Sequence, residues 1–416
     1  CTNIIVKENE VYGRIRPVYL YYVGTTGTTT EISNNTIYTY GGANATTTYT
    51  IMWNTWGGTL NILNNKLPVL NVANTSGTNG VYGMSGLSSG TDAVVNVINN
   101  YVGGDIASTG AAVPGVFSLM YIQDNATYNI YNNTSNYQSL TNATEKSNIH
   151  ISGASCTVNL KNNIIINKTD DSKAYCIWKS NGTLTSDYNN LYVSGANANI
   201  GYYPSARKAL SDWQKAFTPN QDVHSKSKDV NFVSATDLSL TGTSIDDMDL
   251  AVPAIDMVST DIFGNPRYTP NVYMGAHEPN NLNDTQTFTV TVPNGTQHVY
   301  IAGTFLGKSW DITAPFELTT KAKANANEFT GTFPAHSNVE YKYLCETGDW
   351  EYQEAVYEEG IPVQRTTNRT YAVNDIVPIW YRVKSVTLNV SFEASVGVPN
   401  QLFLMSSIND WKEAIE

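Results

Sequence analysis

The chain has 416 residues, enough for two or three domains, and only 14% of them are charged, against roughly 25% in an ordinary soluble domain. Thr, Asn, Ser, Gly and 27 Tyr take the place of charge, a mixture that favours β-structure and excludes most helical fold classes. The net charge of -12, without any Lys/Arg-rich stretch, excludes a nucleic-acid footprint, so no nucleic-acid partner is expected.

Cys1 opens the chain and passes directly into a strand-like pattern. Because a mature bacterial lipoprotein begins with a lipidated cysteine, Cys1 is a candidate lipidation site, and the alternative is a fragment boundary. Such a lipid would be the one expected contact with a membrane, because the longest near-apolar run, residues 111–122, is too short to span a bilayer.

Cys156 and Cys176 occur without a CxxC motif and are expected to be buried free thiols rather than a disulfide. The composition predicts an extracellular or bacterial outer-surface location.

A phrase of the form apolar-Asn-apolar-x-Asn-Asn recurs through the first half of the chain, beginning with LNILNN at residues 60–65. Its Asn-Asn pairs, with a weaker last copy, end at residues 65, 100, 133, 163 and 190, which gives steps of 35, 33, 30 and 27. The alternation predicts one half-buried strand in each coil of a solenoid. Stacked asparagine amides would then donate to one another along its length. The predicted ladder residues are Asn64, Asn65, Asn99, Asn100, Asn132, Asn133, Asn162, Asn163, Asn189 and Asn190.

Three phrases close this region: PAID at 253–256, DIFGNPR at 261–267 and MGAHE at 274–278. Their order resembles the closing coils of the right-handed parallel β-helix proteins of bacterial surfaces, and the resemblance covers most of residues 1–279. It implies a right-handed parallel β-helix over that range. We expect the closing phrases to cap the solenoid, with Arg267 paired to an acidic residue. The candidate partners are Asp256, Asp261 and Glu278.

The predicted solenoid has few residues that are suited to catalysis or to metal binding. The cluster Asp246, Asp247 and Asp249 lacks the spacing and the glycine of a known calcium loop, so calcium is unsupported and no cofactor or metal is expected. A lyase needs a base such as Lys or Arg and a positive group against the uronate, yet no Lys, Arg or His occurs between Leu67 and Glu145. A glycoside hydrolase needs two carboxylates at a suitable spacing, and carboxylates on different coils could meet that condition, so the sequence does not exclude this class. We expect no catalytic residues, and the alternative is a polysaccharide lyase or glycoside hydrolase with accessory binding modules.

The pattern changes after a predicted linker at 280–286. Short alternating strands over 287–383 predict an immunoglobulin-like antiparallel β-sandwich. From residue 384 the pattern starts again, so 384–416 are expected to begin a second, truncated sandwich in which Trp411 matches Trp310. The expected fold class is therefore all-β: a right-handed parallel β-helix (solenoid), one sandwich and the start of another.

Within the first sandwich, VYIAGTFLGKSWDITAPFEL, EYKY and NRTY resemble the starch-binding domain of amylases and glucoamylases. The resemblance covers nearly the whole module and implies that Trp310 and Trp350 stack on glucan while Lys342 bonds its hydroxyl rim. An exposed indole can, by its chemistry, remove the apolar face of a glucose ring from water. One departure is the 17 residues 351–367, where the family has a much shorter spacer. The alternative is that both tryptophans fill the core, as is expected of Trp380.

The expected function is non-catalytic carbohydrate binding, with an α-glucan as one candidate ligand, by a bacterial cell-surface or secreted protein. Its β-helix would serve as scaffold or adhesin. The predicted binding residues are Trp310, Lys342, Trp350 and Trp411. The expected partners are a polysaccharide or oligosaccharide, and other surface proteins or copies of this chain. Besides the enzyme, a second alternative is a structural surface-layer or filament protein.

Overall fold

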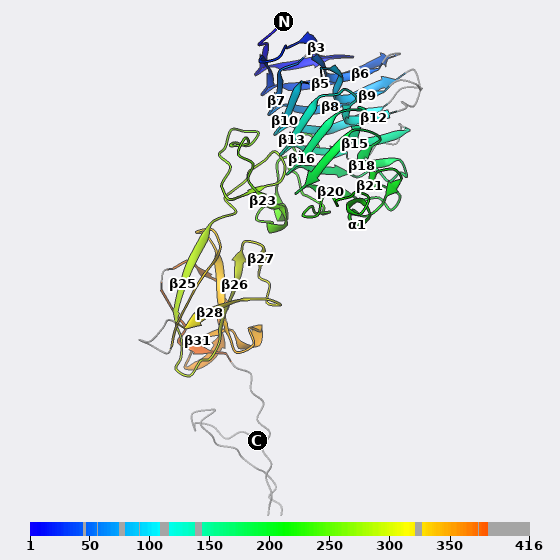
Figure 1. Cartoon of the computed structure of the whole chain (residues 1–416). Helices are drawn as coiled ribbons and strands as arrows, with labels where there is room; N and C mark the ends of the chain where they lie inside the picture. The colour runs from blue at the N-terminus through cyan, green and yellow to red at the C-terminus, as the bar shows by residue number, and fades with distance from the viewer. Residues whose placement is uncertain are drawn as a thin grey trace, which may run out of the picture.

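The computed structural model describes residues 1–44, 47–55, 57–74, 80–90, 92–108, 116–137, 144–320, 327–372 and 374–381. It shows a parallel β-solenoid followed by antiparallel sheets, which confirms the predicted all-β fold class (Figure 1). The second sandwich predicted at 384–416, with Trp411, lies outside the described residues. Among the helices of the described ranges, none has the length and apolar character needed to cross a membrane.

Three sheets of stacked strands form the solenoid, and each coil contributes one strand to each sheet (Figure 1). Sheet A contains β1 (Ile5–Lys7), β4 (Thr29–Ser33), β7 (Thr59–Leu63), β10 (Val94–Ile98), β13 (Thr127–Tyr131), β16 (Thr157–Lys161) and β19 (Thr183–Asp187). Sheet B contains β2 (Glu10–Gly13), β5 (Thr36–Asn44), β8 (Lys66–Asn74), β11 (Tyr101–Ser108), β14 (Thr134–Tyr137), β17 (Ile164–Asn167) and β20 (Asn190–Val193). Sheet C contains β3 (Val18–Val23), β6 (Thr48–Thr55), β9 (Val81–Ser89), β12 (Val116–Ile122), β15 (Glu145–Ile151), β18 (Ala174–Lys179), β21 (Asn199–Tyr202) and the antiparallel β22 (Ala206–Arg207).

The first asparagine of each Asn-Asn pair makes the corner between sheets A and B. Its backbone is left-handed, with φ between 52° and 58°. Asparagine tolerates this region better than most residues with a side chain, which explains its recurrence at the corner. These residues were predicted as ladder members and take no part in the ladder, because the corner turns their side chains out of the stack. They are Asn64, Asn99, Asn132 and Asn162.

The second asparagine of each pair lies in a continuous ladder inside the solenoid. Each Nδ2 donates to the Oδ1 of the next coil at 2.9–3.1 Å, and that Oδ1 also accepts the backbone N–H of the same preceding residue. In the last coil Tyr188 takes the left-handed corner, so Asn189 holds the ladder position and Asn190 instead bonds the backbone of Lys228. The ladder starts at the exposed Asn9, which follows Glu8 in the left-handed corner, and continues through Asn35, Asn65, Asn100, Asn133, Asn163 and Asn189.

A second amide ladder runs along the half-buried outer side of sheet A. The asparagine between the two apolar residues of each phrase donates to its counterpart in the preceding coil at 2.8–3.0 Å. It joins Asn61, Asn96, Asn129 and Asn159. The sequence pattern contained these residues, but no role was predicted for them.

Apolar side chains fill the solenoid between the ladders. Ile62, Val97 and Ile130 stack in register on sheet A and are at most 1% exposed. At the far end, α1 (Leu210–Gln214) inserts the fully buried Trp213 into the same core. Gly201 makes room for it, because a Cβ there would lie 2.3 Å from the indole. This helix therefore closes the C-terminal end of the solenoid.

Residues 227–278, here called the closing segment, return along the outer face of sheet B (Figure 1). Arg267 donates to Glu278 at 2.8 Å and to the corner residue Asn99 at 2.8 Å, with both charged side chains buried. Arg267 is thus paired as predicted, and it fixes the closing segment to a coil far away in sequence. The elements of this segment are η1 (Gly242–Ser244), η2 (Met248–Leu250), β23 (Ala251–Pro253) and β24 (Asn271–Tyr273).

The strand pairs of the sandwich are antiparallel except for β25 with β34, and its core contains Phe288, Phe329 and, as expected, Trp380. The predicted linker is partly packed, since Leu282 is buried with the closing segment. The larger sheet contains β25 (Thr285–Thr291), β26 (Val299–Phe305), β27 (Lys308–Ser309), β28 (Phe316–Thr320), β29 (Glu328–Pro334), β30 (Glu340–Cys345), β33 (Arg369–Thr370) and β34 (Asp375–Ile376). The smaller sheet contains β31 (Glu354–Glu358), β32 (Ile361–Gln364) and β35 (Ile379–Trp380), and η3 (Trp350–Tyr352) precedes it.

Candidate functional site

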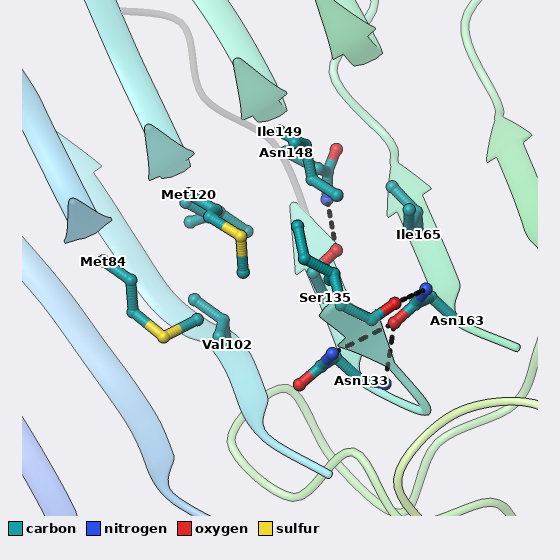
Figure 2. Close-up of a pocket in the computed structure, with 11 residues that line it drawn as sticks. Met84, Val102, Met120, Asn133, Ser135, Asn148, Ile149, Asn163 and Ile165 are labelled. Carbon is teal, nitrogen blue, oxygen red and sulfur yellow. Dashed lines mark hydrogen bonds between the residues drawn. The ribbon is translucent and has the colours of Figure 1, made fainter. Parts of the chain in front are cut away.

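Figure 2 shows a small cavity in the interior of the solenoid. Met84, Val102 and Met120 line it on one side, and the ladder amides of Asn133 and Asn163 lie on the other. Its volume is about 20 Å³. A water molecule needs at least about 10–15 Å³ by this measure, so the cavity has room for about one water and none for a sugar. It is a feature of core packing and not a ligand site.

The cysteines of the solenoid core are not placed to act as nucleophiles. Cys156 and Cys176 are buried and unpaired, as predicted, while Cys1 is exposed. Burial raises the pKa of the Cys156 thiol to about 11 and also raises the pKa of Cys176. Because the thiolate is the reactive form, both thiols are poor nucleophiles at neutral pH. The exposed position of Cys1 is compatible with the predicted lipidation and does not test it.

The acidic cluster of the closing segment is neutralised by lysines. Asp247 lies 2.5 Å from the ammonium of Lys228, and Asp249 lies 3.0 Å from that of Lys226. Asp247 also caps η2 through the backbone N–H of Asp249. Across the described ranges, no group of three or more His, Cys, Asp or Glu side chains is placed to hold a metal ion. The expectation that no cofactor is needed stays a prediction.

An open cleft on the sandwich brings together the predicted residues Trp310, Lys342 and Trp350, and adds Gln353 and Asn368. Both indoles are half-buried and stand outside the core cluster of the sandwich. Their ring centroids are 6.0 Å apart and their planes are inclined by 39°. The cleft measures about 410 Å³, within the range of about 300–1,000 Å³ that small-molecule sites occupy. The two tryptophans therefore form an aromatic surface that solvent can reach.

Trp310 is held in an unusual backbone conformation. It follows β27 directly, and its N–H donates to the carbonyl of Gly303 on β26 at 2.7 Å. Its φ of 53° lies in the left-handed region, which costs on the order of 1–3 kcal/mol for a residue with a side chain. A glycine would adopt this conformation without that cost. Strained residues cluster at ligand sites, although the same conformation also occurs at structural turns of this chain, such as Tyr188 and Asp222.

Polar groups line the floor of the cleft. The Lys342 ammonium donates to the carbonyl of Arg365 at 2.6 Å and to Oε1 of Gln353 at 3.4 Å. Burial lowers the pKa of Lys342, Glu354 opposes that shift, and Arg365 adds to it. Asn368 is exposed and donates to Glu340 at 2.9 Å. Lysine ammonium donors and amide donor–acceptor pairs are the groups that hydrogen-bond sugar hydroxyls.

The long segment after Trp350 is an ordered hairpin. η3 is followed by β31 and β32, which pair with each other, and β31 also pairs with β35. The extra residues 351–367 therefore extend the smaller sheet and leave Trp350 beside Trp310.

A largely buried ion-pair network involves residues next to the cleft residues Gln353 and Lys342 in sequence. Arg369 donates to Glu354 at 2.8 Å and to Asp375 at 2.8 Å, and Glu354 is 1% exposed. Asp375 in turn accepts the hydroxyl of Tyr343, the neighbour of Lys342 on β30. Sequence reasoning missed Gln353 and Glu354. No local sequence pattern identifies these two residues, because the pairing of the hairpin β31–β32 with β35 places them at the site.

No family model matches the chain, and no curated protein matches it. A solved structure that does match is titled "Structure of Hormoconis resinae Glucoamylase". It is 16% identical over 30% of this chain and 23% of that chain, with a TM-score of 0.18, so this chain matches less than a quarter of the glucoamylase.

Proposed function

We propose that this protein binds neutral glycans without cleaving them, through the cleft of Trp310 and Trp350, with α-glucans as the first candidates. The observation that carries this proposal is that two half-exposed indoles share one open cleft outside the core. Each indole offers an apolar face for the C–H side of a sugar ring. Because the ring planes are inclined by 39°, they suit a curved sugar chain better than a flat one.

The polar residues of the cleft give the proposed ligand its chemical class. Gln353 and Asn368 each carry a donor and an acceptor, which matches the hydroxyl group of a neutral sugar. Lys342 is the one cation among the lining residues, and its ammonium already serves two oxygen acceptors. An acidic glycan would need more positive charge than this, and the whole chain has a net charge of -12.

The solenoid fits the role of a rigid support in this proposal. Its ladder of buried amides satisfies polar groups along the whole stack of coils, which makes an extended and stiff body. A protein that holds polysaccharide in this way would act at the bacterial cell surface or after secretion. A lipid on Cys1 would then tether the solenoid to a membrane while the sandwich meets the glycan.

The test is affinity electrophoresis of the whole chain in gels that contain soluble starch, glycogen, barley β-glucan or pectin. We expect starch or glycogen to retard the wild type, and we expect Trp310→Ala to weaken retardation about tenfold or more. Tyr357→Ala is the matched control, because Tyr357 is 56% exposed on β31 and does not line the cleft.

Three outcomes would contradict the proposal. They are retardation in pectin alone, no retardation in any gel, and an equal effect of both substitutions. If Trp310→Ala instead dissolved a self-assembled species in sedimentation, the structural or filament function would replace glycan binding.

A further inference from the structure

The outer face of sheet B is covered only in part. The closing segment contacts it at β8, where Phe263 lies over Lys66, and packs more closely at β11, where Tyr101 shares a buried cluster with Leu238 and Ile262. On the earlier strands β2 and β5, tyrosines occupy the same outer face, since they alternate with the core residues Val11 and Ile37. These tyrosines, Tyr12, Tyr38 and Tyr40, are here called the tyrosine shelf.

The three rings of the tyrosine shelf are nearly parallel. Tyr12 and Tyr38 are in register on neighbouring strands, with centroids 4.6 Å apart and planes within 5°. Tyr40 lies 6.0 Å from each of them, with planes within 9°. Tyr12 is 59% exposed and Tyr40 is 50% exposed. Because the rings hold each other in place, a ligand would lose little additional freedom by ordering them.

A cleft adjoins the shelf at the edge of the closing segment. It is lined by Thr36, Tyr38, Lys66, Pro68, Val69 and Thr236, and it measures about 340 Å³. Thr236 belongs to the closing segment, so the cleft lies between that segment and strands β5 and β8. Its size is within the range of small-molecule sites, about 300–1,000 Å³.

Charges of both signs lie around the shelf. The Lys66 ammonium lies 4.4 Å from the ring centroid of Phe263, a cation–π contact that shields it. Glu10 accepts the hydroxyl hydrogen of Tyr12, which places a carboxylate at the opposite side of the shelf. Aromatic rings, threonine hydroxyls and charges of both signs together match a ligand with apolar ring faces, many hydroxyls and no net charge.

We propose that the tyrosine shelf and its cleft form a second glycan site, on the solenoid itself, for a neutral polysaccharide. It does not share a residue with the Trp310 cleft and goes beyond the function proposed for the sandwich. Two separate contacts on one chain raise the strength of attachment through effective concentration, without any change in either site. The exposed ring surfaces of Tyr12 and Tyr40 take the C–H side of a sugar, and Thr36, Thr236 and Lys66 take its hydroxyls.

The experiment uses the full chain with the sandwich cleft disabled by Trp310→Ala. In this background, affinity electrophoresis in soluble starch, barley β-glucan, galactomannan and polygalacturonate gels measures what the solenoid binds. We expect at least one neutral gel to retard the Trp310→Ala chain. Adding Tyr12→Ala and Tyr40→Ala should then weaken retardation about tenfold or more. Tyr21→Ala is the matched control, because Tyr21 is 56% exposed on sheet C.

The outcomes separate this proposal from the proposed function. If Trp310→Ala removes all retardation, the shelf proposal fails and the sandwich site stands. If Trp310→Ala changes nothing and the shelf variants remove retardation, the sandwich site fails and the shelf stands. Retardation in polygalacturonate alone overturns the neutral ligand. Loss of a concentration-dependent dimer in the Tyr12→Ala variant, without any loss of retardation, would assign the shelf to contact with a second copy.

An unfolded variant would mimic a loss of binding, so folding is checked independently. Both shelf tyrosines chosen for substitution are at least half exposed, and the ladder residues below them are unchanged. Their far-ultraviolet circular dichroism and urea midpoints should match those of the Tyr21→Ala control. If Tyr40→Ala nevertheless unfolds the chain, Tyr12→Phe and Tyr40→Phe keep the rings, and they should retain most of the retardation.

Discussion

Trp310 combines backbone strain with exposure to solvent, and this combination can be tested at the level of one residue. Its left-handed backbone disfavours any side chain, while its indole contacts Trp350 and the open cleft. Trp310→Gly should relieve the strain and lose the indole contact, two effects of opposite sign. We expect a free energy of unfolding within about 1 kcal/mol of the wild type, together with a loss of glycan retardation. Urea unfolding and affinity electrophoresis measure the two effects.

A tryptophan that packs in the core should instead cost the chain stability when glycine replaces it. Trp380 is 5% exposed in the sandwich core and donates to the hydroxyl of Thr296 at 2.9 Å. Trp380→Gly should destabilise the chain by about 3–5 kcal/mol, as is usual for a large-to-small change in a core. If Trp310→Gly destabilised the chain to the same extent, the assignment of Trp310 to the binding cleft would be wrong.

Asp222 ends the inner asparagine ladder on a buried carboxylate. Its oxygens accept hydrogen bonds from Asn189, from the Trp213 indole at 2.8 Å and from two serine hydroxyls. Asp222→Ala would remove the acceptor of the Trp213 indole and of the two serine hydroxyls in the buried interior, so we expect the free energy of unfolding to fall by about 3 kcal/mol or more. Urea unfolding measures this change. Asp256→Ala, at an exposed position, is the control and should stay within about 0.5 kcal/mol.

At the scale of the elements, the two asparagine ladders differ in how deeply they are buried. Oδ1 of Asn133 accepts both the side-chain and the backbone N–H of Asn100 inside the solenoid. Asn129, on the half-buried outer ladder, bonds only side chains of its neighbours in the contacts described above. Asn133→Ala should therefore cost about 2–4 kcal/mol and Asn129→Ala less than about 1 kcal/mol. Equal costs in urea unfolding would show that the inner ladder does not hold the coils together.

The strands of the solenoid could be predicted because each phrase alternates apolar and polar residues at a fixed place in the coil. The identity of the ladder residue could not be predicted from the pair alone. Both asparagines of Asn132-Asn133 have the same chemistry, and only the φ of 52° at Asn132 assigns one to the corner and the other to the stack. Tyr188 in the last coil shows the same rule, because a different residue there shifts the ladder position to Asn189.

The cleft was predictable in its aromatic part and not in its polar part. Trp310 and Lys342 stand in phrases that resemble the starch-binding domain, and the same resemblance implies a binding role for Trp350, so all three residues could be predicted without the structure. Gln353 reaches the cleft through η3 and the hairpin after it, whose pairing with β35 depends on contacts distant in sequence. Long-range pairing of this kind leaves no local pattern in the chain.

For the molecule as a whole, one histidine joins the sandwich to the closing segment. His336 bonds Asp284 at 2.9 Å through Nδ1 and Asp246 at 3.1 Å through Nε2. Burial opposes the positive charge of this imidazole, but the two carboxylates outweigh it, and the pKa of His336 is raised above its ordinary value. The charged form of His336 therefore strengthens the junction between the two domains.

This junction should weaken as the pH rises. The raised pKa means that its contribution is fully present below a pH of about 6.5, the ordinary histidine value, and is lost as the pH passes the raised pKa. The effect should be about 1 kcal/mol, because the two carboxylates are about 40% exposed. Small-angle scattering should show a broader range of dimensions at pH 8.5 than at pH 5.5.

Two variants distinguish the pH-dependent contribution of His336 from the contributions of other histidines. His336→Gln should remove the pH dependence, while His298→Gln, in an exposed pair with Glu317, should keep it. Scattering profiles that are identical at both pH values in the wild type would show that His336 does not control the junction.

Calorimetric titration of the full chain with maltoheptaose tests glycan binding at the sandwich most directly. We expect saturable binding by the wild type, and an affinity reduced about tenfold or more by Trp310→Ala and by Trp350→Ala. Binding that neither substitution weakens, or no binding of maltoheptaose by a wild-type chain that is fully folded, would contradict the assignment of an α-glucan to this cleft.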